Sequence, residues 1–592
     1  MRIIHYRVTV FAFVLFSFGF SNLYAQQKSG DYAAQWKKID DLVNKGLTKS
    51  ALAEVDKIYA LSKKDDNDPQ LIRALLYKFT LNQSVEENAN VNNIDTLEKE
   101  IRTAKEPAKS ILESITAEMY WSIFQQQRWK IYNRTKTDTS FKKKDILTWS
   151  ADDFHDTISK LYLASIKDDK LLKQTKLEPF DAIILKGNVR YLRPTLYDLL
   201  AHRALDYFKS DENDITKPAY AFEIKDEKAF VPVGDFIHQK FENKDSTSLH
   251  YKALLIFQDL LAFHQNDAKP DALIDADIER INFVKQYGVM GNKDELYIAA
   301  LQNIANQFSN NAASAQASYL IAQQIFDKAN SNQKNVDTSR YSIKNAKQIA
   351  EAIANKFPES EGGINAKNLL NQVLHKDLSL TSEKINIPGE PFRTLVTYKN
   401  FSSLNFRIIE MTPQFKKLIE SNEDNDALWK KLTSQKFIRS WKQNLVATDD
   451  YLSHSVEIKA DALPVGQYAL LASVDDEFSL DKNPLAVQYF HVSNISYINN
   501  GLEYFILDRE TGQPLDGAKV QVWKQKYDYK TGKNGLEKKE LLTADEHGYI
   551  KVSPNKKDET SYIRLEIFYQ HDHLFLDDYQ YSYSYNTIIS LV

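Results

Sequence analysis

The chain has 592 residues, more than one hydrophobic core normally holds, so several domains are expected. With 43% hydrophobic and 26% charged residues, its composition is typical of folded proteins and excludes wholesale disorder. A net charge of −4 leaves no basic excess for binding nucleic acid. The absence of cysteine excludes disulfides, thiolate nucleophiles, cysteine-ligated metals and lipid attachment through cysteine.

Residues 1–25 have the pattern of a secretory signal peptide. Arg2 and Arg7 precede an apolar run over residues 8–20, and a more polar stretch ends at Ala25. The run is shorter than the ~20 residues that a membrane anchor needs, so cleavage is favoured over an uncleaved anchor. The sequence therefore predicts export to the periplasm or cell envelope, with no membrane span after cleavage.

Residues 26–380 are expected to form an α-helical array of the tetratricopeptide-like kind. Apolar residues recur three and four positions apart, as in the stripe that begins with Trp36 and Ile39. Asp68 followed by Pro69 predicts a helix start, with Asp68 as the N-cap. This pattern indicates short antiparallel helices joined by tight turns.

An internal repeat lies near the end of this array, offset by 49 residues. The motif Ile-Ala-Asn with a following Phe occurs at residues 304–308 and again at 353–357, and Ala317 is matched by Ala366. Small residues at helix crossings and an aromatic before the break are typical of helical-hairpin repeats. The period exceeds the usual ~34 residues, so an insertion around residues 330–338 is expected.

Two β-sandwiches of the immunoglobulin-like type are expected after the array, at residues 381–493 and 494–592. Short runs with period two, separated by Pro and Gly turns, predict their strands. A helical period over residues 413–432 predicts a helical insertion in the first sandwich. The strands are predicted at residues 392–398, 404–409, 454–458, 468–472, 486–490, 504–508 and 518–523, with a last one ending near residue 552.

Several strings resemble bacterial alpha-2-macroglobulin family proteins. DRETGQPLDGAKVQVW at residues 508–523, with TADEHGYIKV at 543–552, is similar to a macroglobulin domain signature. PGEPFRTLVTYKNFSSLNFRIIEM at residues 388–411 resembles the start of the preceding macroglobulin sandwich. AEMYWSIFQQQRWKIYNRT at 117–135 and YLRPTLYDLLAHRALDYF at 191–208 resemble the N-terminal helical extension of one branch of the family.

The resemblance implies a large periplasmic or cell-surface protein that traps proteases. A bait segment is cleaved in such proteins, and thioester members then bind the attacker covalently through a Cys–Gln bond. This chain has no cysteine for a thioester, and it is expected to stop before the later macroglobulin, bait and thioester domains. Inhibitory activity is therefore not expected from this chain alone.

Three groups of residues could carry chemistry, and each has a structural interpretation that is favoured. The acidic turn at residues 65–68 lacks the glycine and glutamate of a calcium-binding EF-hand loop. The aromatic residues of 120–132 could stack on sugars or bases, but their helical spacing favours a core. The third group is a loose metal-ligand cluster of His571, Asp572, His573, Asp577 and Asp578. A solvated polar turn is the favoured interpretation of these residues.

No catalytic residue, metal or cofactor is expected, because no nucleophile elbow, zinc-protease helix or phosphate loop occurs. The leading hypothesis is a noncatalytic, exported N-terminal portion of an alpha-2-macroglobulin-like protein. Proteases are then the expected partners, with other envelope proteins as further candidates for the helical array. The alternative is a stand-alone envelope protein that binds a peptide or glycan in the groove of its helical repeats.

Overall fold

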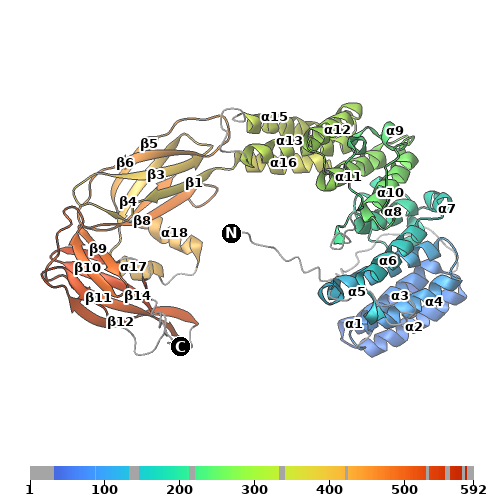
Figure 1. The fold of residues 1–592 in the computed structure, drawn as a ribbon, viewed down its shortest axis with the longest axis horizontal. Helices are drawn as coiled ribbons and strands as arrows, with labels where there is room; N and C mark the ends of the chain where they lie inside the picture. Colours follow the sequence, from blue (N-terminus) through green and yellow to red (C-terminus); the bar gives the residue numbers. More distant parts are fainter. Residues whose placement is uncertain are drawn as a thin grey trace, which may run out of the picture. The chain divides into compact units, whose positions relative to one another are not determined.

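The computed structural model describes residues 32–86, 89–132, 146–212, 220–331, 341–420, 424–528, 532–553, 561–575 and 580–582. Helices form the first part of the chain and β-sheets the last part, which confirms the predicted order of α then β (Figure 1). The predicted signal peptide lies outside the described residues. The chain divides into two compact units, unit 1 over Met1–Ile304 and unit 2 over Ala305–Val592.

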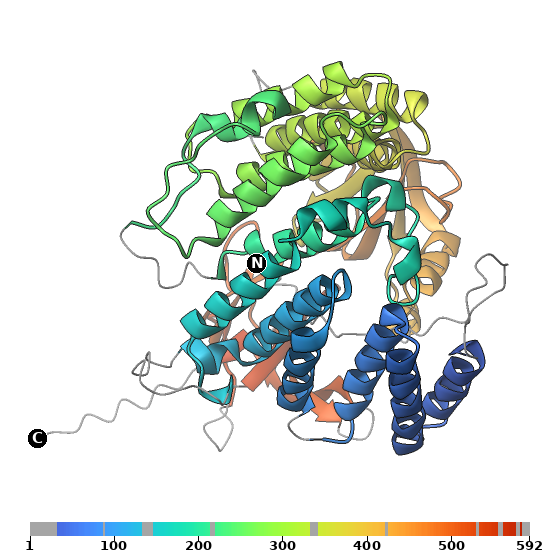
Figure 2. The ribbon, with the colours of Figure 1, turned by 90° about the vertical axis from the view of Figure 1, so that its right-hand side faces the viewer.

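Unit 1 consists of helices that pack against their neighbours in the sequence. Helices α1, α2 and α3 lie side by side (Figure 2) and enclose the predicted stripe, in which Trp36 and Ile39 are buried. No described helix is both long and apolar enough to cross a bilayer. The helices are α1 (Tyr32–Asn44), α2 (Thr48–Lys64), α3 (Asp68–Asn82), α4 (Ala89–Thr103), α5 (Ala108–Tyr132), α6 (Ala151–Ser165), α7 (Asp169–Gln174), α8 (Leu196–Phe208), α9 (Val233–Phe236), α10 (Leu249–His264), α11 (Asp271–Tyr287) and α12 (Lys293–Gln307), the last of which crosses into unit 2.

The turn between α2 and α3 corrects one prediction, because Asp68 is not the N-cap of α3. Asn67 is the cap, and its side chain accepts a hydrogen bond from the Gln70 amide at 3.3 Å. Asp65 in the same turn accepts the hydroxyl of Tyr32 at 2.9 Å. Asn and Asp are about equally good caps, so composition alone could not choose between adjacent positions. Two polar side chains of this acidic turn thus serve the protein's own structure.

The helical repeat begins at the end of α12, where Ile304 is the last residue of unit 1, and continues in unit 2 on α13 (Ala315–Ser331), α15 (Ser342–Lys356) and α16 (Glu361–Leu374). Ala317 and Ala366 are both fully buried, as helix crossings require. The residues that precede these two alanines are also in contact, because the Asn365 side-chain amide donates a hydrogen bond to the Gln316 side chain at 3.0 Å. The expected insertion falls mostly on residues 332–340, outside the described part of the chain.

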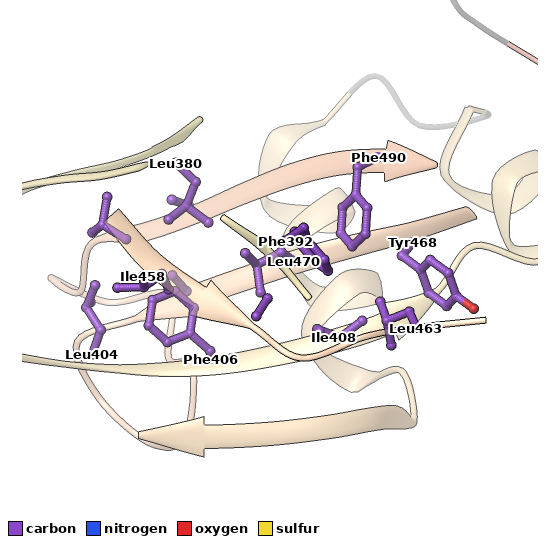
Figure 3. Close-up of a cluster of buried hydrophobic side chains, with 14 of the residues drawn as sticks. Leu380, Phe392, Leu404, Phe406, Ile408, Ile458, Leu463, Tyr468, Leu470 and Phe490 are labelled. Atoms are coloured by element: carbon purple, nitrogen blue, oxygen red, sulfur yellow. The ribbon is translucent and has the colours of Figure 1, made fainter. Parts of the chain in front are cut away.

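The first sandwich has two sheets that enclose one core (Figure 3). Burial alternates along β3, where Phe392, Thr394, Val396 and Tyr398 point inward. The five strands and the helical insertion predicted here are confirmed. One sheet has the order β1-β3-β6 and the other β2-β8-β7-β4-β5. The strands are β1 (Asp377–Ser382), β2 (Ile385–Asn386), β3 (Phe392–Lys399), β4 (Ser403–Glu410), β5 (Phe437–Asn444), β6 (His454–Ala460), β7 (Gly466–Ser473) and β8 (Leu485–Val492).

The helical insertion covers the outer face of the larger sheet. It consists of α17 (Pro413–Glu420) and α18 (Asn425–Ser434), which connect β4 to β5. Phe415 and Leu432 of the insertion form a second core with Ala469 and Leu471 of β7. Strand β7 is consequently buried on both faces, which explains its unbroken apolar run.

The second sandwich has sheets of order β13-β10-β9 and β12-β11-β14-β15, with β16 also paired to β14. Its core includes Tyr504 and Ile506 from one sheet and Val520 and Ile567 from the other. The predicted strands at residues 504–508 and 518–523 and the one ending near 552 are confirmed. The strands are β9 (Ile495–Asn500), β10 (Glu503–Asp508), β11 (Lys519–Asp528), β12 (Lys533–Thr543), β13 (Tyr549–Lys551), β14 (Ser561–Tyr569), β15 (Asp572–Phe575) and β16 (Gln580–Ser582).

Both sandwiches share one strand order. If the small β2 and β16 are set aside, the first, second and fifth strands of each form one sheet. The fourth, third, sixth and seventh strands, in that spatial order, form the other. The same topology therefore occurs twice in succession.

Candidate functional site

The structure places Asp572 and His573 of the metal-ligand cluster on opposite faces of one strand. Asp572 and His573 are adjacent on β15, so their side chains point to opposite faces. The Asp572 carboxylate accepts the Asn494 amide at 2.7 Å, whereas His573 lies 3.0 Å from the Glu566 carboxylate on the outer face. Asp577 and Asp578 lie outside the described residues. Among the residues that are described, no group of three or more His, Asp or Glu side chains could hold a metal ion.

Most of the aromatic residues on α5 belong to the core, as their helical spacing predicts. Tyr120 and Phe124 are buried, and Tyr132 donates its hydroxyl to the Glu212 carboxylate at 2.8 Å. Trp129 is the exception, with 74% of its surface exposed. A stacking platform for a sugar or base needs several exposed rings, and this helix presents one large exposed ring.

A buried histidine between two carboxylates is a candidate acid–base group in unit 1. His264 at the end of α10 places its ring nitrogens 2.7 Å from Asp198 of α8 and 2.7 Å from Asp267. Burial alone would lower the pKa of His264, but the two carboxylates outweigh it, and the pKa lies above its ordinary value. The two carboxylates thus favour the doubly protonated ring.

This arrangement does not form a general base. A catalytic histidine needs one ring nitrogen free to accept a proton from the reactant, and both nitrogens of His264 are in contact with carboxylates. His264 and Asp198 are also 2% and 1% exposed, which leaves no approach for a substrate. The group is a buried ion pair that fixes α8 against α10.

The sequence alone did not reveal this pair, because Asp198 and His264 are 66 positions apart. A local signal was nevertheless present. Thr195 and Asp198 form a capping box, in which the Thr195 hydroxyl and the Asp198 side chain bond each other's backbone amides. That box fixes the Asp198 side chain at the start of α8, where its second oxygen meets His264.

A second buried histidine, His155 of α6, is neutral. Burial lowers its pKa to about 4. Its Nδ1 atom lies 2.9 Å from the Tyr207 hydroxyl, and the ring packs against Trp121 and Phe124. With 5% of its surface exposed, His155 is a core residue rather than an accessible base.

Side-chain hydrogen bonds and apolar packing join the helices of unit 2 to the first sandwich. Asn400, which follows β3 with a φ of 64°, donates its amide to the carbonyls of Val373 at 2.8 Å and His375 at 2.7 Å. These carbonyls lie at the C-terminus of α16, where the helix leaves them unpaired. From the segment before β6, Tyr451 and Leu452 pack against the core of the helical repeat.

The connection between the two sandwiches is short. Only Ser493 and Asn494 separate β8 from β9. The Ser493 amide donates to the Asn386 carbonyl at 3.0 Å, and the Asn494 amide donates to the Asp572 carboxylate at 2.7 Å. Ile385 of the first sandwich also packs against the core of the second. Both sides of the connection are thus fixed by hydrogen bonds and by packing.

Comparison with known proteins gives no assignment by similarity. No family model matches the chain, and no curated protein matches it.

Proposed function

We propose that this chain is a noncatalytic N-terminal portion of an exported alpha-2-macroglobulin-like protein, whose family role is to trap proteases in the cell envelope. The observation that carries the proposal is the repeated strand order of the two sandwiches. Two copies of one sandwich in tandem, after a helical region, are what the sequence resemblance predicts.

The strand order also supports an immunoglobulin-like class for both sandwiches. Constant-type immunoglobulin domains place strands A, B, E and D in one sheet and C, F and G in the other. The sandwiches here keep that division except for the fourth strand, which pairs with the third. Related sandwich domains vary in this way without a change in architecture.

A noncatalytic role in positioning other domains suits the two short junctions. Domains joined by flexible linkers move independently, whereas each junction here has hydrogen bonds and apolar packing on both sides of it. The helices of the repeat and the two sandwiches therefore form one stiff segment. A chain without cysteine contributes no thioester, so its part in trapping would be to position other domains.

Chemical cross-linking of the tagged full chain in intact cells, followed by mass spectrometry, tests the proposal. Cross-links to proteases or to polypeptides with macroglobulin domains would support it. The purified chain should also show no turnover with a panel of peptidase, glycosidase and esterase substrates. Turnover that survives repurification would refute the noncatalytic role, and one defined peptide or glycan bound by the helical repeats would favour the alternative of a binding protein.

A further inference from the structure

A loop in unit 1, residues 181–193, presents apolar side chains to solvent, and we call it the apolar loop. Leu185 is 98% exposed, Tyr191 60% and Val189 47%. Single exposed apolar residues are common on protein surfaces, but three within seven positions form a patch. Among the residues that the structure describes, none covers Leu185.

Ion pairs and one buried side chain anchor the base of the apolar loop. The Asp181 carboxylate pairs with both Lys186 and Arg190, at 2.7 Å each, and so joins the start of the loop to its far side. The Ile183 amide donates to the carbonyl of Phe180 at 2.9 Å, and the Phe180 side chain is buried. The tip that carries Leu185 therefore projects from an anchored base.

The charges of the loop are positive. Residues 182–193 contain three cations and no acid. Asp181 at the base offsets one of them, and Arg193 lies 3.9 Å from the nearest carboxylate oxygens, those of Asp275 and Glu279. Glu279 is also shared, because His202 and Lys209 contact it. The apolar tip is thus surrounded by positive charge that the protein does not fully neutralise.

A convex apolar tip, an interfacial tyrosine and surrounding lysine and arginine are the features of a segment that inserts at a membrane surface. Leu185 and Val189 would enter the acyl boundary, while Lys186 and Arg190 contact phosphate groups. A protein pocket could also accept Leu185, but positive charge around the tip complements an anionic headgroup layer. We propose that the apolar loop is a peripheral membrane contact for an anionic phospholipid surface, which goes beyond the function proposed above.

The absence of cysteine allows a direct test, because Leu185→Cys places the only thiol of the full chain at the tip. An environment-sensitive fluorophore on this thiol should brighten when vesicles of equal phosphatidylglycerol and phosphatidylcholine are added. Partitioning to these vesicles should exceed that to pure phosphatidylcholine by roughly tenfold, and salt should weaken it. The matched control is Leu47→Cys, at an exposed leucine before α2 whose label should not respond.

Unlabelled variants then test the side chain itself by vesicle co-sedimentation. Leu185→Asp should lower vesicle binding by roughly tenfold or more, because it places a charge at the inserting tip. Leu47→Asp should not change binding, and it is expected to fold because aspartate is favoured at a helix N-cap. Equal binding to neutral and anionic vesicles, or equal loss in both variants, would overturn the proposal. A label at position 185 that responds to a soluble envelope protein but not to vesicles would overturn it as well.

Discussion

Replacement of Gly362 by alanine tests the close approach of α16 to α13. Gly362 is buried in the first turn of α16. An added Cβ would lie 2.1 Å from the carbonyl carbon of Ala315 and 2.3 Å from the amide nitrogen of Gln316. Both are backbone atoms at the start of α13, so no rotation of a side chain relieves the overlap. One of the two helices must move.

Two opposing effects set the size of the change. Alanine is favoured over glycine by up to about 1 kcal/mol inside a helix, and by less in the first turn. Overpacking of a well-packed core costs about 1–3 kcal/mol, and a shift of α16 would also strain the Asn365–Gln316 hydrogen bond. We expect Gly362→Ala to lower the free energy of unfolding by about 1–2 kcal/mol.

Urea unfolding of the full chain, followed by circular dichroism, measures this change. Gly234→Ala is the matched control, because it makes the same substitution in α9 with nothing within 4 Å of the new Cβ. The control should be neutral or slightly stabilising. Two compact units allow two transitions, and the loss should be confined to one of them. A Gly362→Ala midpoint that equals or exceeds the control midpoint would refute the reasoning.

Substitutions at three further residues test the buried histidines and the sandwich junction. Burial lowers the pKa of His155 to about 4, so the free energy of unfolding should fall by up to about 3 kcal/mol as the pH drops from about 6.5 to 4. In acid-unfolding titrations, the His155→Asn variant should lose most of this pH dependence. The pKa of His264 is raised, so its contribution is complete below about pH 6.5 and is lost as the pH rises through the folded value. The deficit of His264→Gln in urea unfolding should therefore shrink in base. Asp572→Ala should expose the connection between the sandwiches to limited proteolysis, whereas Asp572→Asn, which keeps an acceptor for the Asn494 amide, should not.

Sequence periodicity predicts strands such as β3, in which one face is buried and the other is largely exposed, and the apolar run of β7, which is buried on both faces. In β3 the inward positions begin with Phe392 and alternate strictly, and the predicted range 392–398 is one residue short of the observed strand. Strand β5 is not among the predicted strands, because none of its residues is fully buried and its sequence shows no regular alternation of apolar and polar positions. It is a strand because β4 pairs with it, which is information from another segment.

Polar contacts between distant segments were also beyond prediction. The partner of His264 on α8 depends on how two helices pack, and the cap that Asn400 provides for α16 depends on a turn that follows β3. The metal-ligand cluster shows the same limit. Adjacent positions 571–573 suggest a common site, but strand geometry points neighbours to opposite faces.

The helix–sandwich junction draws its strength from packing more than from charge. An ion pair at this junction, Lys344–Asp449 at 2.5 Å, joins side chains that are 42% and 64% exposed. Exposed pairs contribute about 0–1 kcal/mol and weaken further in salt. Tyr451 and Leu452, by contrast, pack against the helical core, and Asn400 pairs carbonyls that the helix end would leave open. Because charge screening weakens neither apolar packing nor neutral hydrogen bonds, the junction should remain closed at salt concentrations that abolish the ion pair.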